Sequence, residues 1–126
     1  MKTQLKKVEE FHKAFTEVNG DEPQLLNEDL FMLRYNLMRE ENTEYLEACS
    51  DKDLIKLADA LGDQLYVLLG TILKHGLQYK IEEVFDEIHK SNMSKLGIDG
   101  KPVFREDGKI LKGPNYFKPN ILRILE

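Results

Sequence analysis

The chain has 126 residues, of which 23 are acidic and 18 basic, so its formal net charge is −5. This charge argues against a general binder of nucleic acids or anionic membranes, because such proteins need a basic surface that displaces phosphate counterions. Residues 1–89 carry 19 acidic and 10 basic side chains (net −9), whereas residues 90–126 carry 4 acidic and 8 basic ones (net +4). We therefore expect an acidic body, a basic tail and no nucleic-acid partner.

Length and composition favour a single domain over residues 1–126. Hydrophobic residues make up 41% of the chain and charged residues 33%, which allows a modest core. No apolar run approaches the roughly 20 residues that cross a bilayer, and the first residues lack the apolar segment of a secretory signal. Cys49 is the only cysteine, which excludes an internal disulfide and a cysteine-based zinc site. We expect a cytoplasmic protein without a membrane partner.

Apolar residues at steps of three and four predict two helices in the first part of the chain. The first helix covers residues 3–18 and ends at Asn19-Gly20. The second begins after a cap at Asn27 and runs to about Ala48.

Two further helices are predicted in the middle of the chain. The third begins at a cap formed by Ser50 or Asp51 and ends before Gly76. It is apolar nearly all round, which predicts a central, buried helix. The fourth covers about residues 79–93. The expected fold class is all-α.

Helical periodicity is lost after the fourth helix, where glycine and proline become frequent. Asp107-Gly108 favours a short hairpin, because it lies between the apolar pairs Val103-Phe104 and Ile110-Leu111. We expect a last helical turn at residues 121–125. The predicted architecture is therefore a four-helix bundle over about residues 3–95 with a basic, looped tail over about residues 96–126.

The second helix carries an acidic stripe. Three leucines share one arc of this helix at about 100° per residue, and three glutamates of an EExxE pattern continue the arc: Leu30, Leu33, Leu37, then Glu40, Glu41, Glu44. The pattern alone is a weak signal, since many solvated helices contain it. The position of the glutamates on the same arc as the leucines makes a site more plausible, because carboxylates that face a core need a partner to stay ionised. A cation is the simplest partner.

The third helix supplies two more carboxylates. Asp59 and Asp63 stand four residues apart, on one face of a helix whose other residues are mostly apolar. An ion pair with Lys56 is an alternative for Asp59, whereas Asp63 has no such neighbour in this segment. A cluster made only of carboxylates suits hard ions, Mg²⁺ first and Mn²⁺ second, rather than zinc.

These two segments resemble the all-α nucleoside triphosphate pyrophosphohydrolases, which include MazG-like proteins and phosphoribosyl-ATP pyrophosphohydrolase. The family pattern is EExxE on one helix and ExxD on the next, and the three glutamates and then Asp63 match it. The glutamate expected three residues before the aspartate is Ala60 here, so the fourth ligand is either Asp59 in a shifted geometry or absent. The resemblance covers about residues 33–119 and implies a homo-oligomer, a dimer or a tetramer.

The basic tail holds residue types that bind phosphates. Asn92 and Lys95 are three residues apart and so lie on one helical face. In the resembling branch, an Asn-x-x-Lys after the fourth helix and a later Lys-Gly-Pro-x-Tyr are associated with the phosphates of the nucleotide. The resemblance therefore implies a substrate-binding role for Asn92, Lys95, Lys112 and Tyr116. The alternative is an ordinary solvated basic loop.

The resemblance implies Mg²⁺-dependent hydrolysis of a (deoxy)nucleoside triphosphate between its α and β phosphates. The main metal ligands are then Glu41, Glu44 and Asp63, with Asp59 as a further ligand. Glu40 is a ligand or, with Glu41, a catalytic residue that orients the attacking water. House-cleaning of nucleotide pools is favoured over phosphoribosyl-ATP hydrolysis, because nothing in the sequence specifically reads a phosphoribosyl group.

Two other classes stay open at this point. Ala60 is compatible with a non-catalytic nucleotide-binding or helical interaction module. The Glu9-x-x-His12 spacing is also found in di-iron bundles, although that template needs the motif on two helices.

Overall fold

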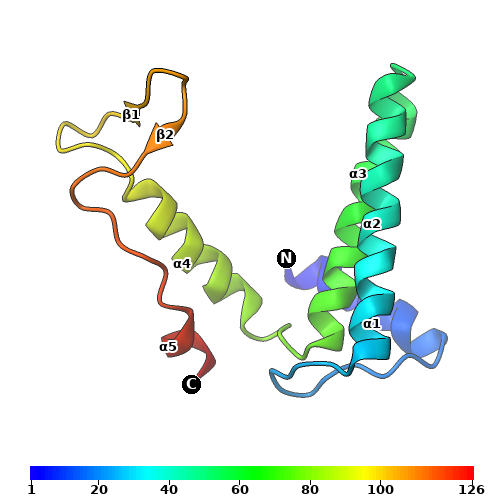
Figure 1. The fold of residues 1–126 in the computed structure, drawn as a ribbon. Helices are drawn as coiled ribbons and strands as arrows, with labels where there is room; N and C mark the ends of the chain where they lie inside the picture. Colours follow the sequence, from blue (N-terminus) through cyan, green and yellow to red (C-terminus); the bar gives the residue numbers. More distant parts are fainter. The chain divides into compact units, whose positions relative to one another are not determined.

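The computed structural model describes all 126 residues and is mostly helical, which confirms the predicted all-α class (Figure 1). The elements in chain order are α1 (Lys2–Ala14), α2 (Glu28–Ser50), α3 (Leu54–Lys74), α4 (Ile81–Met93), β1 (Val103–Phe104), β2 (Ile110–Leu111) and α5 (Ile121–Leu125). They divide into two compact units, which are described separately: unit 1 comprises Met1–Tyr79 and unit 2 comprises Lys80–Glu126.

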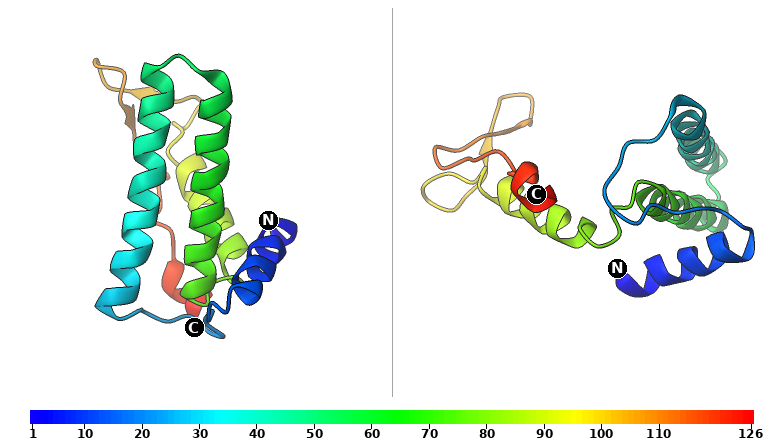
Figure 2. Two further views of the ribbon diagram at one scale, coloured as in Figure 1. Left: turned by 90° about the vertical axis from the view of Figure 1, so that its right-hand side faces the viewer. Right: turned by 90° about the horizontal axis from the view of Figure 1, so that it is seen from below.

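The helices α2 and α3 lie side by side and antiparallel in unit 1 (Figures 1 and 2). The predicted cap of α2 is confirmed, because the Asn27 side chain accepts a hydrogen bond at 3.1 Å from the backbone N–H three residues on. The cap of α3 is Asp53, whose side chain accepts from the Lys56 N–H at 3.0 Å, so the prediction of Ser50 or Asp51 was wrong. The reason is that α2 continues through Ser50 and has Asp51 as its C-cap, so both residues belong to the end of α2. The free N–H groups at the start of α3 begin only at Leu54.

The first helix ends at Ala14, short of its predicted end at residue 18. Thr16 adopts a left-handed φ of 59°, which no regular helix contains. The loop that follows is fastened to the last turn of α3, where the Gly20 N–H donates to the Leu73 carbonyl at 2.9 Å. The Leu73 carbonyl also accepts from the Gly76 N–H, so the loop adds a second hydrogen bond at the end of α3 and holds α1 beside α3.

The core of unit 1 lies around the C-terminal half of α3, where α1 packs against it. Its buried apolar side chains come from these two helices: Leu5, Val8, Leu69, Ile72 and Leu73. Arg34 of α2 is also buried, and its guanidinium donates to the Val67 carbonyl at 2.9 Å and to the Thr71 hydroxyl at 3.1 Å. These hydrogen bonds join α2 to α3 inside the core.

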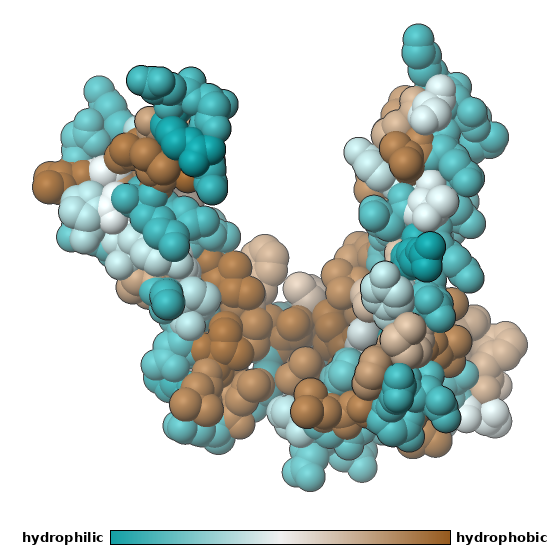
Figure 3. Space-filling view, in the orientation of Figure 1, coloured by the Kyte–Doolittle hydropathy of each residue, from teal (hydrophilic) through white to brown (hydrophobic).

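One face of α3 is less buried than the apolar sequence of this helix predicts. Leu61, Leu65 and Leu68 are each about half exposed, at 48%, 51% and 47%. Within the chain, α3 packs mainly against α2 and α1, which cover only part of its circumference. The prediction of a central, buried third helix therefore holds for only part of the α3 surface in the single chain. Figure 3 shows apolar side chains at the surface of both units.

Unit 2 is built on α4. The predicted hairpin is confirmed, because β1 and β2 pair antiparallel with Val103 opposite Leu111, and Gly108 in the turn has a φ of 87°. The short helix α5 packs on α4, where the buried Glu87 carboxylate accepts a hydrogen bond from the Asn120 N–H at 3.1 Å. No helix in either unit combines the length and the apolar character that a membrane crossing requires.

Candidate metal centre

Three carboxylates converge midway along the α2–α3 pair. Glu41 and Glu44 lie one turn apart on α2, and Asp63 comes from α3. One oxygen of each lies within 4.8 Å of the corresponding oxygens of the other two. Octahedral Mg²⁺ binds oxygens at about 2.1 Å, so that opposite ligands are about 4.2 Å apart. Small side-chain movements would therefore bring all three carboxylates to one ion. We call Glu41, Glu44 and Asp63 the carboxylate group.

Glu41 is the most perturbed member of the carboxylate group. Its Oε2 atom is buried and has no hydrogen-bond partner. Burial, the contact with Glu44 and the negative charge of Asp63 raise the pKa of Glu41 to about 7. A buried oxygen without a partner is costly, and a divalent cation would remove that cost. The residues present therefore fit a hard, oxygen-seeking ion.

The other two predicted ligands lie outside the carboxylate group. Glu40 and Asp59 are both exposed. The alternative partner of Asp59 is engaged elsewhere, since the Lys56 Nζ lies 3.4 Å from Asp51 Oδ2. Ala60, which stands where the family pattern has glutamate, is only 2% exposed. The roles of Glu40 and Asp59 as ligands stay predictions.

An amide pair beside the carboxylate group was missed by the reasoning from sequence. The Gln64 Nε2 donates a hydrogen bond to the Asn42 Oδ1 at 2.9 Å, and this bond joins α3 to α2. Each of the two residues directly follows a member of the carboxylate group along the chain. This shared position next to a predicted ligand is the sequence feature that could have identified the pair.

In unit 2 the predicted phosphate-binding residues lie on two segments that contact each other. The Gly113 N–H donates to the Lys95 carbonyl at 2.8 Å, so the later loop packs on the chain at the end of α4. In the same loop, the Lys112 Nζ lies 4.7 Å from the centroid of the Tyr116 ring. Asn92 is exposed in the last turn of α4. The structure therefore brings Lys95 close to the segment that carries Lys112 and Tyr116.

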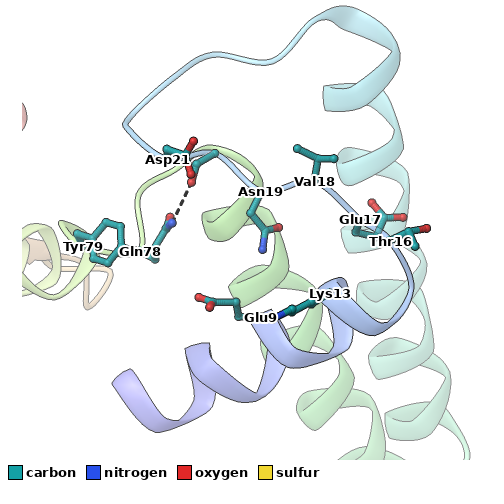
Figure 4. A pocket seen from close by; sticks show the side chains of 10 residues that line it. Glu9, Lys13, Thr16, Glu17, Val18, Asn19, Asp21, Gln78 and Tyr79 are labelled. Atoms are coloured by element: carbon teal, nitrogen blue, oxygen red, sulfur yellow. Dashed lines mark hydrogen bonds between the residues drawn. The ribbon is translucent and has the colours of Figure 1, made fainter.

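A polar cleft of about 440 Å³ lies elsewhere in unit 1, around the loop that follows α1 (Figure 4). Its acidic side chains do not converge as those of the carboxylate group do, and Glu17 is ion-paired with the buried Lys74. That ion pair lowers the pKa of Glu17. Gln78 and Gly20 both line the cleft, and the Gln78 Nε2 donates a hydrogen bond to the Gly20 carbonyl at 2.9 Å. The cleft therefore offers no comparable metal site.

Comparisons with known proteins identify the family. The family model of phosphoribosyl-ATP pyrophosphohydrolase matches residues 8–92, a range that contains the whole carboxylate group. A solved structure from Exiguobacterium sp. 255-15, described as a "putative NTP pyrophosphohydrolase", is 25% identical with a TM-score of 0.50. The similarity covers 94% of this chain and 90% of that chain. No curated protein matches the chain. The chain therefore belongs to the phosphoribosyl-ATP pyrophosphohydrolase family, within the MazG-like superfamily, and is a hydrolase of the nucleotide pyrophosphohydrolase type.

Proposed function

We propose that the protein hydrolyses a (deoxy)nucleoside triphosphate between its α and β phosphates, in a reaction that depends on Mg²⁺. The products are a nucleoside monophosphate and pyrophosphate. The observation that carries this proposal is the convergence of Glu41, Glu44 and Asp63 inside the segment that matches the family. The buried, unpartnered Oε2 of Glu41 supports it, because that atom lacks the positive partner that a metal ion provides.

In this proposal the carboxylate group would hold the metal ion. Asp59, one turn before Asp63 on α3, would add a further ligand. When bound, the ion supplies Lewis-acid chemistry by polarising the α-phosphoryl group and acidifying the attacking water. Glu40, which is exposed beside Glu41, either joins the ligands or accepts the proton of that water. The water oxygen then bonds to the α phosphorus, and the bridging oxygen leaves with the pyrophosphate.

The phosphates of the substrate are bound by four residues of unit 2 in this proposal: Asn92, Lys95, Lys112 and Tyr116. Lysine amines and asparagine amides donate hydrogen bonds to phosphate oxygens, and the two lysines offset part of their charge. The contact between the Lys95 carbonyl and the following loop supports a shared role, because it holds both segments close together.

House-cleaning of nucleotide pools in the cytoplasm is the role that we propose, with Mn²⁺ able to replace Mg²⁺. Hydrolysis of phosphoribosyl-ATP is the second candidate, and the family match favours it. A panel of nucleotides separates the two by comparing kcat/KM for deoxynucleoside triphosphates, ribonucleoside triphosphates and phosphoribosyl-ATP.

We also propose that the protein is a homodimer or homotetramer. The half-exposed leucines Leu61, Leu65 and Leu68 support this, because a second copy of the chain would remove their apolar surface from water. Light scattering coupled to size exclusion measures the mass in solution. A monomer at micromolar concentration would contradict the assembly.

The activity is tested by incubating the purified protein with Mg²⁺ and each nucleotide and identifying the released phosphate species. We expect pyrophosphate and no orthophosphate. Glu41→Ala and Asp63→Asn should abolish turnover, whereas Glu47→Gln, at an exposed glutamate of the same helix as Glu41, should not. Orthophosphate release, or full activity of Glu41→Ala, would contradict the proposal. Nucleotide-dependent thermal stabilisation without turnover would favour the non-catalytic alternative.

A further inference from the structure

Two sets of side-chain hydrogen bonds cross from α2 to α3. Near the start of α2, Arg34 donates to the Val67 carbonyl and the Thr71 hydroxyl. Farther along, Gln64 donates to Asn42 at 2.9 Å. The first set is buried and belongs to the core, whereas the second lies nearer the surface, among the residues that carry the carboxylate group.

The position of the Asn42–Gln64 pair ties it to the carboxylate group. Asn42 directly follows Glu41 on α2, and Gln64 directly follows Asp63 on α3. Consecutive side chains on a helix point about 100° apart, so the pair lies beside the carboxylates rather than among them. The hydrogen bond therefore joins the two helices at the level where ligands from both must meet.

A metal ion requires its ligands at fixed distances and angles, so the axial alignment of α2 and α3 must be kept at this level. A shift of α3 by one residue relative to α2 is a screw motion, which would move Asp63 by about 1.5 Å along the helix axis and turn it by about 100°. Mg²⁺ requires near-octahedral geometry with bonds of about 2.1 Å, so such a shift would separate Asp63 from the two glutamates. A hydrogen bond between the two helices opposes such a shift, because it weakens steeply when its donor, hydrogen and acceptor move out of line.

The chemistry of the pair also suits this position. Amides carry no charge, so Asn42 and Gln64 neither neutralise the carboxylate group nor add a competing anion beside it. A lysine at either position would pair with the carboxylates and oppose the binding of a cation. An apolar pair would contribute packing but no directional bond between the two helices.

We propose that Asn42 and Gln64 are positioning residues: their hydrogen bond holds the α2 and α3 halves of the carboxylate group in register for a divalent cation. The inference rests on the proposed function, since it requires that the carboxylate group binds metal. Loss of a partner that orients metal ligands typically costs about 10–100-fold in affinity. For a pair this close to solvent the expected loss is smaller, about three- to tenfold.

Binding of Mn²⁺ to the full chain, followed by electron paramagnetic resonance, tests the pair without relying on turnover. The variants N42A and Q64A should each weaken Mn²⁺ binding about three- to tenfold, and the double variant should bind no more weakly than either single variant. The exchanged pair N42Q/Q64N keeps a donor and an acceptor and should retain most of the affinity. N36A removes another exposed asparagine from α2 and is the matched control.

The inference is overturned by unchanged Mn²⁺ affinity in both single variants, by additive losses in the double variant, or by an equal loss in N36A. A lower thermal stability with unchanged Mn²⁺ affinity would assign the pair a purely structural role and would also overturn it. Absence of Mn²⁺ binding in the wild-type protein would instead refute the metal site of the proposed function. That failure needs no variant, so the two failures are distinguishable.

Discussion

The Glu41→Gln variant should be more stable than the wild-type protein at pH 8 without metal, although it removes a proposed ligand. Burial, Glu44 and Asp63 raise the pKa of Glu41 from 4.5 to about 7. A carboxyl group with a higher pKa in the folded state binds protons more tightly there, so the folded protein loses stability as the pH rises from about 4.5 to about 7. The rise in pKa sets a ceiling of about 3 kcal/mol. Because the side chain is partly exposed and solvent screens its charge, we expect about 1–2 kcal/mol.

Thermal unfolding in the presence of EDTA, at pH 5 and at pH 8, measures this effect. The midpoint of Glu41→Gln should exceed that of the wild type by roughly 3–8 °C at pH 8, and the difference should shrink at pH 5. Mg²⁺ should then stabilise the wild type but not the variant. Glu47→Gln, on the same helix, should change the stability by less than about 0.5 kcal/mol. The reasoning is refuted if Glu41→Gln is less stable at pH 8 or gains as much from Mg²⁺ as the wild type.

Other measurements test the same structure. The Mn²⁺ affinity of the wild type should rise about tenfold between pH 6 and pH 8, because a proton on Glu41 competes with the ion; a pH-independent affinity would contradict this. Gly70→Ala should destabilise the protein by about 1–3 kcal/mol in chemical unfolding, because its Cβ would lie 2.7 Å from the Arg34 Nη2. Gly62→Ala should instead stabilise it by about 0.5–1 kcal/mol, because that Cβ meets nothing within 4 Å, and the reverse order would refute the packing. Glu87→Ala should speed hydrogen exchange in α5 and leave α2 and α3 unchanged, since it removes the acceptor of a backbone N–H that precedes α5.

Local chemistry made much of the chain predictable. The cap at Asn27, the end of α3 before Gly76 and the turn at Asp107-Gly108 each depend on a few neighbouring residues, so the sequence determined them without knowledge of the fold. The acidic stripe was readable for the same reason, because helical phase follows from spacing alone. The side-chain chemistry of the carboxylate group, and hence the kind of ion that we propose for it, could therefore be predicted from the sequence.

The level at which the two acidic segments meet was decided only by the tertiary structure. Asp59 and Asp63 share a face of α3 by their spacing, yet only Asp63 lies with the two glutamates of α2. Antiparallel helices bring their side chains together at one axial level, and that level depends on contacts remote in sequence, such as those of Arg34 and of the Asn42–Gln64 pair. The early end of α1 and the half-exposed leucines of α3 likewise depend on contacts between helices. Spacing along the chain determines which side chains share a helix face, whereas packing between helices decides which faces meet.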